Sequence, residues 1–578
     1  MRGREAIGYV VSVEGARITL NLNDSHKGHV ASHRSGVSSV TDINSFLGVD
    51  GGPRILVVRV VSLSFLEPRE AHKTMMPQGQ LNAMPLRQLN AVVAGWLNRG
   101  EDGKFIFTAD SLTTPSLGAE AFPLSRDELS AVINPEVDSD GALLLGTDCR
   151  SGIDLKTGID DFLGRHIAVL GSSGQGKSCF SAAIVQQLVK LGHPRIVIFD
   201  INGEFEPAFE GHLSGDDIKV TTIGGGEKPY KIPYYALGRH GLSRLLLPSE
   251  KTQRPALSFA LEHLKHVKWF SDQGGVGLAD QTQACMYDDC RPGDAKGSLE
   301  AIQKLRSGQK MQEGTEWCHM AALAALVAES HSVKQGKNNA ERDGFHYSNV
   351  APLVTRIRRF IDDPMFCAVL DVEGGKPCGK SLNWGEESSA LVSQLFGDDK
   401  SKWKLHILNL KHIAHDLMPV VLGGLLELFA FELFKRGQGK THPTLLVLEE
   451  AHHYLRQIAD DDGSKNALAY ERLAKEGRKF GLGLWISTQR PSEVSDTVLA
   501  QCGTWVVFRL TSETDQRTVG TAAEWIDKLE VSRIAGLPRQ QALVFGACIP
   551  VPVRINAPTA KPLPNSEDPD FSQWYKKE

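Results

Sequence analysis

The sequence lacks the features that place a chain outside the cell. Its N-terminus, Met1 to Glu5, leads directly into alternating strand-like sequence and contains no apolar signal region. The nine cysteines are scattered and odd in number, which argues against a disulfide framework. Cys285 and Cys290 are the closest pair, but no neighbouring Cys or His pair completes a zinc site. We therefore expect a cytoplasmic protein with reduced thiols.

A convincing membrane span is also missing. The stretch Leu417–Phe434 is apolar over the length of a span, but Glu427 and Glu432 interrupt it. Because charged groups at that depth of a bilayer are costly, we predict a buried core helix instead. We expect no membrane attachment.

The chain has neither an excess of positive charge nor an internal repeat. A formal net charge of −5 gives no overall attraction to nucleic acid, although a local basic patch remains compatible with it. With 41% hydrophobic and 23% charged residues, the composition is that of a globular protein. At 578 residues the chain is too long for one hydrophobic core, so several domains or large insertions are expected.

Changes in sequence pattern divide the chain into segments. The first is β-rich, with alternating apolar residues and Gly-containing turns, and predicts a small barrel or sandwich for assembly or docking. Later segments alternate strands and helices, the pattern of a parallel α/β sheet. The predicted segments are an N-terminal β-barrel at 1–110, a linker at 111–150, an α/β core at 151–240 and 401–556, a helical insertion at 241–400, and at 557–578 a tail that wraps a neighbour or stays disordered.

Seven short runs are candidates for the strands of the core. Most are continuously apolar, as strands covered on both faces of a sheet must be. The predicted core strands are His166–Leu170, Ile196–Asp200, Leu405–Leu410, Leu445–Leu448, Leu484–Ser487, Trp505–Leu510 and Ala542–Phe545.

A glycine-rich loop after the first of these strands predicts phosphate binding. It ends in Lys177 and Ser178 and leads into a segment with helical periodicity, the strand–loop–helix setting of a P-loop. There the backbone N–H groups and the helix N-terminus bind phosphate, the lysine reaches the outer phosphates, and the serine hydroxyl can bind Mg²⁺. The predicted nucleotide-binding residues are Gly171, Ser172, Ser173, Gly174, Gln175, Gly176, Lys177, Ser178 and Cys179.

Two acidic residues follow another apolar strand, in the stretch Thr444–His452. Neighbouring side chains leave a strand in opposite directions, so Glu449 and Glu450 can take different tasks. We predict that Glu449 holds Mg²⁺, directly or through water, and that Glu450 polarises the attacking water. Two carboxylates after a strand are common by chance. Their occurrence together with a P-loop is what indicates a catalytic role.

Asp200 ends the second predicted strand and starts the turn Asp200–Phe205. A carboxylate at a strand C-terminus in an open α/β sheet points into the ligand crevice. A purely structural turn built by Asn202 and Gly203 is an equally good interpretation. The same turn contains Glu204, a further candidate catalytic residue.

Phosphoryl transfer also needs positive charge on the γ-phosphate, often from an arginine of a neighbouring subunit. Candidates cluster in the segment 472–481, which contains Arg472, Arg478 and Lys479. Gln489 follows the next strand and could contact both water and γ-phosphate as a sensor. For any single arginine here, a solvated helix face is the simpler interpretation.

Together these motifs resemble the HerA family of hexameric DNA-translocating ATPases, relatives of the FtsK-type motor proteins. The resemblance implies an α/β, RecA-like P-loop core with ATP and Mg²⁺ as cofactors and double-stranded DNA in the channel of a homo-hexameric ring. It also implies that Glu450 is the catalytic carboxylate, Arg478 the arginine finger, Gln489 the sensor and Arg165 a second arginine near the nucleotide. The matching stretches are 165–178, 200–205, 448–452, 477–483 and 487–492.

The sequence departs from the family in places. Asn409 stands where relatives often have Asp, which puts in doubt any acidic role on that strand. Lys219, Lys228 and Lys231 are candidates for basic residues that line the pore.

The resemblance further implies a partner enzyme, a nuclease or a sirtuin-type effector, docked on the barrel and acting in DNA end processing or antiviral defence. A different hypothesis is an ATP-binding scaffold that assembles and regulates a partner without processive translocation. A conjugation-type coupling ATPase is a third hypothesis, but it would need a membrane anchor or recruitment by a membrane partner.

Overall fold

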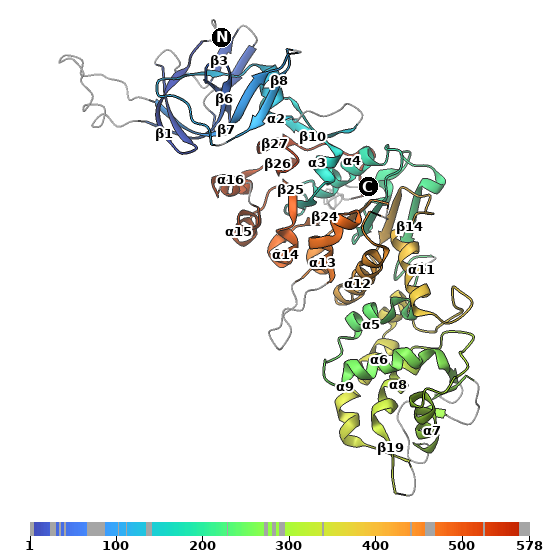
Figure 1. Cartoon of the computed structure of the whole chain (residues 1–578). Helices are drawn as coiled ribbons and strands as arrows, with labels where there is room; N and C mark the ends of the chain where they lie inside the picture. Colours follow the sequence, from blue (N-terminus) through green and yellow to red (C-terminus); the bar gives the residue numbers. More distant parts are fainter. Residues whose placement is uncertain are drawn as a thin grey trace, which may run out of the picture. The chain divides into compact units, whose positions relative to one another are not determined.

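The chain is described by a computed structural model (Figure 1) that divides into two compact units. Unit 1 comprises Met1–Ile184 and Cys502–Thr559, and unit 2 comprises Val185–Gln501 and Ala560–Glu578. The structure describes residues 5–23, 30–33, 36–39, 42–65, 87–101, 103–110, 112–134, 141–227, 229–270, 275–279, 285–287, 295–337, 340–439, 442–456, 469–523, 526 and 528–565.

Unit 1 begins with a closed β-barrel, which confirms the prediction for the N-terminus. The strand order is β2-β1-β9-β5-β6-β7, and pairing of β2 with β7 closes the ring. Strand β8 extends the sheet beyond β7, and β9 comes from the segment predicted as a linker. The strands are β1 (Gly8–Glu14), β2 (Arg17–Leu22), β5 (Phe46–Asp50), β6 (Ile55–Phe65), β7 (Arg87–Arg99), β8 (Phe105–Ala109) and β9 (Glu120–Pro123), with a separate hairpin β3 (Val30–His33) and β4 (Gly36–Ser39) and helix α2 (Arg126–Ile133).

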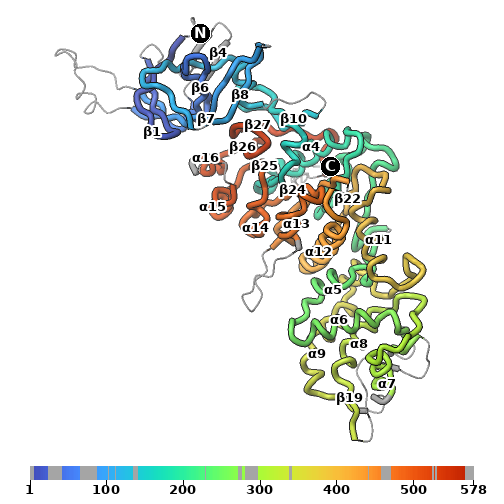
Figure 2. Tube along the Cα trace, in the orientation of Figure 1, coloured from blue at the N-terminus to red at the C-terminus, as the bar shows by residue number. Residues whose placement is uncertain are grey.

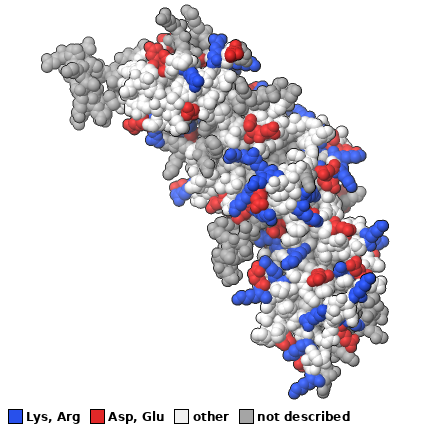
Figure 3. Space-filling model, in the orientation of Figure 1, with Lys and Arg blue, Asp and Glu red and all other residues white. Residues whose placement is uncertain are grey.

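Alternation along these strands builds the barrel core. In β2, Ile18, Leu20 and Leu22 are buried while the residues between them are not, as the period of two requires. Outside the barrel, Leu63 and Phe65 at the end of β6 are 44% and 64% exposed. The visible face of the barrel is mostly uncharged (Figure 3).

Unit 1 also contains six strands of α/β sheet in the order β11-β10-β27-β26-β25-β12. Strands β12 and β25 are parallel, with Ala168 opposite Trp505, but β26, β27, β10 and β11 run antiparallel to their neighbours. The expectation of a parallel sheet is therefore wrong at this edge, because an apolar run reports burial but not strand direction. The elements are β10 (Ala142–Asp148), β11 (Asp154–Gly158), α3 (Ile159–Leu163), β12 (His166–Leu170), α4 (Lys177–Leu188), β25 (Cys502–Val507), α15 (Glu513–Ala522), α16 (Lys528–Arg533), β26 (Gln541–Gly546) and β27 (Val553–Asn556).

Unit 2 contains five strands in the order β24-β23-β13-β22-β14, all parallel. The seven predicted core strands of the two units are all present close to their predicted limits. The carboxyl ends of parallel strands lie at the same edge of a sheet, so the carboxyl ends of the adjacent strands β13, β23 and β24 are neighbours. The elements are β13 (Ile196–Asp200), β14 (Ile218–Thr222), β22 (Leu405–Asn409), α12 (Met418–Arg436), β23 (Thr444–Leu448), α13 (Ala469–Glu476), β24 (Leu482–Thr488) and α14 (Asp496–Leu499).

Helix α12 is the buried helix that the sequence predicts. Its Glu432 is 3% exposed, and two neighbours compensate the cost of burying this carboxylate. Ser389 donates a hydrogen bond of 2.7 Å to it, and the ammonium group of Lys435 lies 3.4 Å away. Among the described residues, no helix has the length and apolar character needed to cross a membrane.

The segment between β14 and β22 is mainly helical, as predicted, and its helices group together (Figures 1 and 2). Aromatic rings pack at its base, where the Tyr235 and Trp317 rings stack 5.2 Å apart. Short strands that the sequence analysis did not expect are also present. The elements are β15 (Ile232–Pro233), α5 (Gly238–Leu246), α6 (Gln253–His263), β16 (Val267–Phe270), β17 (Gly275–Leu278), β18 (Cys285–Tyr287), α7 (Ala295–Arg306), α8 (Ala321–Ser332), β19 (Val333–Gln335), β20 (Ala340–Arg342), α9 (Gly344–Asp362), α10 (Pro364–Val369), β21 (Leu370–Asp371) and α11 (Trp384–Phe396).

The described start of the C-terminal tail is extended and lies against its own chain. The Lys561 N–H donates to the side chain of Gln186 at 3.0 Å, and the Asn565 N–H donates to the Glu204 carbonyl at 2.8 Å. The rest of the predicted tail lies outside the described residues.

Candidate functional site

The glycine-rich loop of unit 1 has the form that its sequence predicts. It leaves β12 at Leu170 and enters α4 at Lys177. Gly171 is required by close packing, since a Cβ there would lie 2.5 Å from the Cβ of Phe508. Gly174 has φ +70°, a conformation that other residues rarely adopt.

Neighbouring segments fix the backbone of this loop. The Ser172 N–H donates to the Arg509 carbonyl at 2.8 Å, and the Gln540 N–H donates to the Gln175 carbonyl at 3.0 Å. Both acceptor and donor segments flank β25 and β26 of the same unit, so the loop is held from two sides.

Lys177 is a buried cation at the start of a helix. It is 6% exposed, and its Nζ donates a long hydrogen bond of 3.4 Å to the Ser172 carbonyl. A buried ammonium group is costly unless a negative group compensates it. Ser178 and Cys179 follow in the first helical turn, where backbone N–H groups have no partner within the helix. This donor set fits the phosphates of a nucleotide.

The paired carboxylates lie in unit 2, directly after β23. Glu449 is 6% exposed, and its backbone carbonyl accepts a hydrogen bond of 3.0 Å from the Tyr454 hydroxyl. Glu450 has φ +45° and ψ +46°, the left-handed region. For a residue other than glycine this conformation costs about 1–3 kcal/mol, and such strain is concentrated at functional sites.

His452 is a residue of this site to which the sequence analysis assigned no role. Its Nδ1 lies 3.3 Å from Oε2 of Glu450 and 3.0 Å from the hydroxyl of Thr488, the last residue of β24. A histidine two residues after a carboxylate carries no spacing signal of its own. Gln489, the predicted sensor, follows Thr488 and is partly buried at the same sheet edge.

Asp200 closes a turn, which favours the structural interpretation of that segment. Its Oδ1 accepts from the N–H groups of Gly203 and Glu204 at 2.8 and 3.0 Å, and its Oδ2 accepts from Phe205 at 3.0 Å. Burial raises the pKa of the Asp200 carboxyl, although these N–H donors act in the opposite direction. The Glu204 side chain is partly buried.

The structure separates the candidate arginines. The Arg472 guanidinium lies 4.2 Å from the centre of the Phe434 ring on α12 and 3.4 Å from the Glu476 carboxylate on its own helix, so these two helices hold it. Arg478 is exposed in the short turn that ends α13. Arg165 in unit 1 is also exposed.

Two of the three guessed pore lysines are described. Lys219 donates a hydrogen bond of 2.7 Å to the Gln394 carbonyl, whereas Lys231 is exposed. Lys228 lies outside the described residues. Among the residues that the structure describes, no group of three or more His, Cys, Asp and Glu side chains could hold a metal ion.

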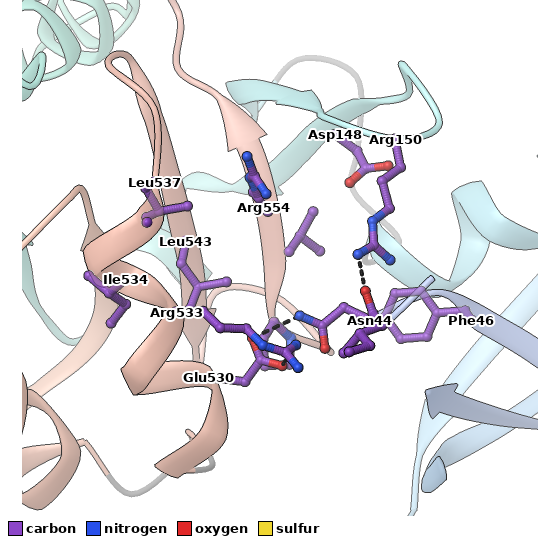
Figure 4. A pocket seen from close by; sticks show the side chains of 14 residues that line it. Asn44, Phe46, Asp148, Arg150, Glu530, Arg533, Ile534, Leu537, Leu543 and Arg554 are labelled. Atoms are coloured by element: carbon purple, nitrogen blue, oxygen red, sulfur yellow. Dashed lines mark hydrogen bonds and ion pairs between the residues drawn. The ribbon is translucent and has the colours of Figure 1, made fainter. Parts of the chain in front are cut away.

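A pocket of about 270 Å³ lies in unit 1 where the barrel meets α16 and β27 (Figure 4). Its charged groups are engaged within the chain. Glu530 accepts from Arg59 and from Asn44, each at 2.9 Å, and Arg150 donates to the Ile43 carbonyl. The side chains of Arg59 and Glu530 are only 13% and 6% exposed. We therefore assign these contacts a structural role, and we name the Arg59–Glu530–Asn44 cluster the barrel joint.

Comparison with known proteins supports the motifs. Residues 141–311 match the family described as "Helicase HerA, central domain". The DNA double-strand break repair helicase HerA of Pyrococcus furiosus is 24% identical over 479 residues, covering 77% of this chain and 74% of the relative. The corresponding helicase of Saccharolobus solfataricus is 22% identical over 471 residues, covering 80% and 77%.

Among solved structures, VirB4 of Thermoanaerobacter pseudethanolicus aligns with a TM-score of 0.44 and 15% identity, covering 73% of this chain and 98% of that one. The sequence relationship is the informative finding. Residues 141–311 thus match the central domain of helicase HerA, and the chain is similar to the HerA helicases over most of its length.

Proposed function

We propose that this protein is an ATP-dependent translocase or helicase for double-stranded DNA. The observation that carries the proposal is the buried Lys177 at the N-terminus of α4, behind a loop where Gly171 leaves no room for a side chain. This is a cradle for the outer phosphates of a nucleotide. The relationship to HerA helicases supports DNA as the substrate on which the energy of hydrolysis is used.

In this proposal each residue has a separate task. Lys177 binds the β- and γ-phosphates, and Ser178 and Glu449 hold the magnesium ion, directly or through water. When bound, Mg²⁺ supplies charge that stabilises the transferring phosphoryl group. Glu450 orients the attacking water and accepts its proton. The partly buried Gln489 senses the γ-phosphate from the adjacent strand end.

We further propose that the protein acts as a homo-hexameric ring. Arg478 is exposed on its own subunit, as a group that reaches a neighbouring nucleotide must be. An arginine finger supplied across a subunit boundary stabilises the charge of the transition state. Arg165 is a second candidate for contact with the nucleotide.

Double-stranded DNA would pass through the central channel of this ring. Contacts to phosphates rather than bases would allow movement without sequence preference. Because the net charge of the chain is −5, the DNA contacts must be local, and they would be strongly weakened by salt.

The barrel would dock a partner effector, a nuclease or a sirtuin-type enzyme, in antiviral defence or DNA end processing. Its exposed apolar side chains support a docking role, since Leu63 and Phe65 lie together at the end of one strand. Large exposed apolar groups of this kind are frequent at protein interfaces.

The test is ATP turnover with and without double-stranded DNA. We expect DNA to stimulate turnover, Glu450→Gln to reduce it about 10²–10⁴-fold, and Lys177→Ala to abolish nucleotide binding. The exposed Glu513, 89% accessible at its side chain, provides the matched control Glu513→Gln, which should behave like the wild type. Normal turnover in Lys177→Ala would overturn the proposal. Ring assembly and partner binding without turnover would instead favour the scaffold hypothesis.

A further inference from the structure

His452 stands between the proposed catalytic carboxylate and the end of the neighbouring strand. Its ring is fully enclosed, with a side chain that is 3% exposed. The same nitrogen, Nδ1, faces the Glu450 carboxylate at 3.3 Å and the Thr488 hydroxyl at 3.0 Å. One nitrogen atom therefore connects a residue after β23 to the last residue of β24.

The proton on that nitrogen follows from its surroundings. An ionised carboxylate can only accept hydrogen bonds, so an unprotonated Nδ1 would face Glu450 lone pair to lone pair. The Thr488 oxygen already accepts from the Arg490 N–H at 3.0 Å. In the Nδ1–H tautomer, His452 donates its hydrogen bond to the Thr488 oxygen, and the same nitrogen lies 3.3 Å from Glu450 Oε2, an ion-pair distance at which no hydrogen bond is formed.

Contacts on the far side of His452 hold it in place. Its carbonyl accepts a hydrogen bond of 2.7 Å from Nε of Arg456, which is in turn paired with Glu493 at 2.8 Å. The His453 ring packs 4.0 Å from the His452 ring. Burial, with the neighbouring histidines His452 and His415, lowers the pKa of His453 to about 4. His453 is therefore neutral at pH 7 and places no charge beside Glu450.

We propose that His452 is a positioning residue, which holds the Glu450 carboxylate in its catalytic orientation and couples it, through Thr488, to the strand end that carries Gln489. The inference rests on the proposed function, because it presumes that Glu450 acts on the attacking water. Glu450 needs such support, since its left-handed backbone is strained and a single side-chain rotation would move its carboxylate away.

The coupling has a mechanical consequence. Thr488 and Gln489 are consecutive, so a displacement of the β24 end by a ligand at Gln489 changes the distance from Thr488 to Nδ1. The N–H group of His452 would then interact more or less strongly with the Glu450 carboxylate. In this way the presence or absence of the γ-phosphate at Gln489 would affect the Glu450 carboxylate through Thr488 and His452.

The test exploits the geometry of amide side chains. In Asn, the amide nitrogen is bonded to Cγ, as Nδ1 is in His, whereas in Gln it lies one bond further out. We expect His452→Ala and His452→Gln to lower kcat of DNA-stimulated ATP turnover about tenfold to 100-fold, with KM changed less than about threefold. His452→Asn should recover most of the lost kcat. The matched control is His453→Asn, which should stay within about threefold of the wild type.

Thr488 provides an independent arm that leaves His452 intact. Thr488→Ser keeps the hydroxyl and should retain kcat, whereas the isosteric Thr488→Val should lower it about tenfold. The double variant His452→Ala with Thr488→Val should lose little more than His452→Ala alone, because both changes break one connection. If the histidine variants fail to fold, judged by the loss of a cooperative melting transition, the threonine pair decides.

Two results would overturn the inference. One is a wild-type kcat in both His452→Gln and Thr488→Val. The other is an equal loss in His452→Asn and His452→Ala with unchanged melting temperatures, since then the donor position would not matter. Failure of the proposed function is distinguishable, because in that case Glu450→Gln would itself retain turnover.

Discussion

Replacing Gly171 by alanine tests whether the P-loop binds nucleotide through its backbone. The added Cβ would lie 2.5 Å from the Cβ of Phe508, whereas carbon atoms in ordinary contact are about 3.5–4.0 Å apart. The loop and Phe508 must therefore separate by about 1 Å.

Phe508 cannot provide that displacement. It is fully buried, and its ring packs edge-on against the ring of Phe180 on α4, with the centroids 6.0 Å apart. Its N–H also donates a short hydrogen bond of 2.7 Å to the Leu170 carbonyl. The loop must move instead, and a shift of about 1 Å would break one of its N–H bonds to phosphate. Hydrogen bonds to charged groups contribute about 1.5–3 kcal/mol each.

We therefore expect Gly171→Ala to weaken ATP binding by about 1.5–3 kcal/mol, or roughly 10-fold to 150-fold in Kd. Titration of a fluorescent ATP analogue measures this directly. Gly192→Ala is the control, because a Cβ at Gly192, in the turn after α4, meets no atom within 4 Å. A Kd for Gly171→Ala equal to that of the control, with both proteins folded, would refute the reasoning.

Three further predictions concern other parts of the chain. At the barrel joint, Arg59→Leu and Glu530→Leu should each destabilise unit 1 by about 3 kcal/mol and the double variant by less than the sum, measured by denaturant unfolding; additive losses would mean that the pair is not coupled. Arg478→Ala should retain ATP binding but lose turnover about 10³-fold or more, and mixing with Glu450→Gln subunits should restore activity; no restoration would exclude action across the interface. The alanine variant of Gly203, where φ is +73°, should lower stability by about 1–2 kcal/mol in thermal melts, and an unchanged melting temperature would contradict a tight turn there.

Local signals explain what could be predicted from the sequence. A continuous apolar run and a glycine loop ending in Lys177 and Ser178 each lie within a few neighbouring residues, so the core strands and the phosphate loop were accessible. The direction of β26 could not be predicted, because the same buried run fits a parallel or an antiparallel neighbour. The role of Asp200 stayed open for a similar reason, since only the positions of the N–H groups distinguish a turn from a ligand crevice.

Contacts between distant parts of the chain were beyond prediction. Arg59 and Glu530 are 471 positions apart, and neither lies in a motif. His452 was visible beside Glu450, but its second partner, Thr488, enters only through the pairing of β23 with β24. The P-loop lies in unit 1 and the carboxylates lie in unit 2. The order of the motifs along the sequence does not predict this division into units.

The division of unit 1 between the two ends of the chain affects its biosynthesis. Strand β12, which leads into the phosphate loop, pairs with β25, and more than 300 residues are translated between the two parts of the unit. At about 5–20 residues per second, β12 leaves the ribosome roughly 15–60 s before its partner strand exists. During that interval an apolar strand is exposed on the nascent chain. A nascent polypeptide truncated before Cys502 therefore lacks Arg509 and Gln540, whose backbone hydrogen bonds hold the phosphate loop, and we expect nucleotide to assist folding only after translation has passed both residues.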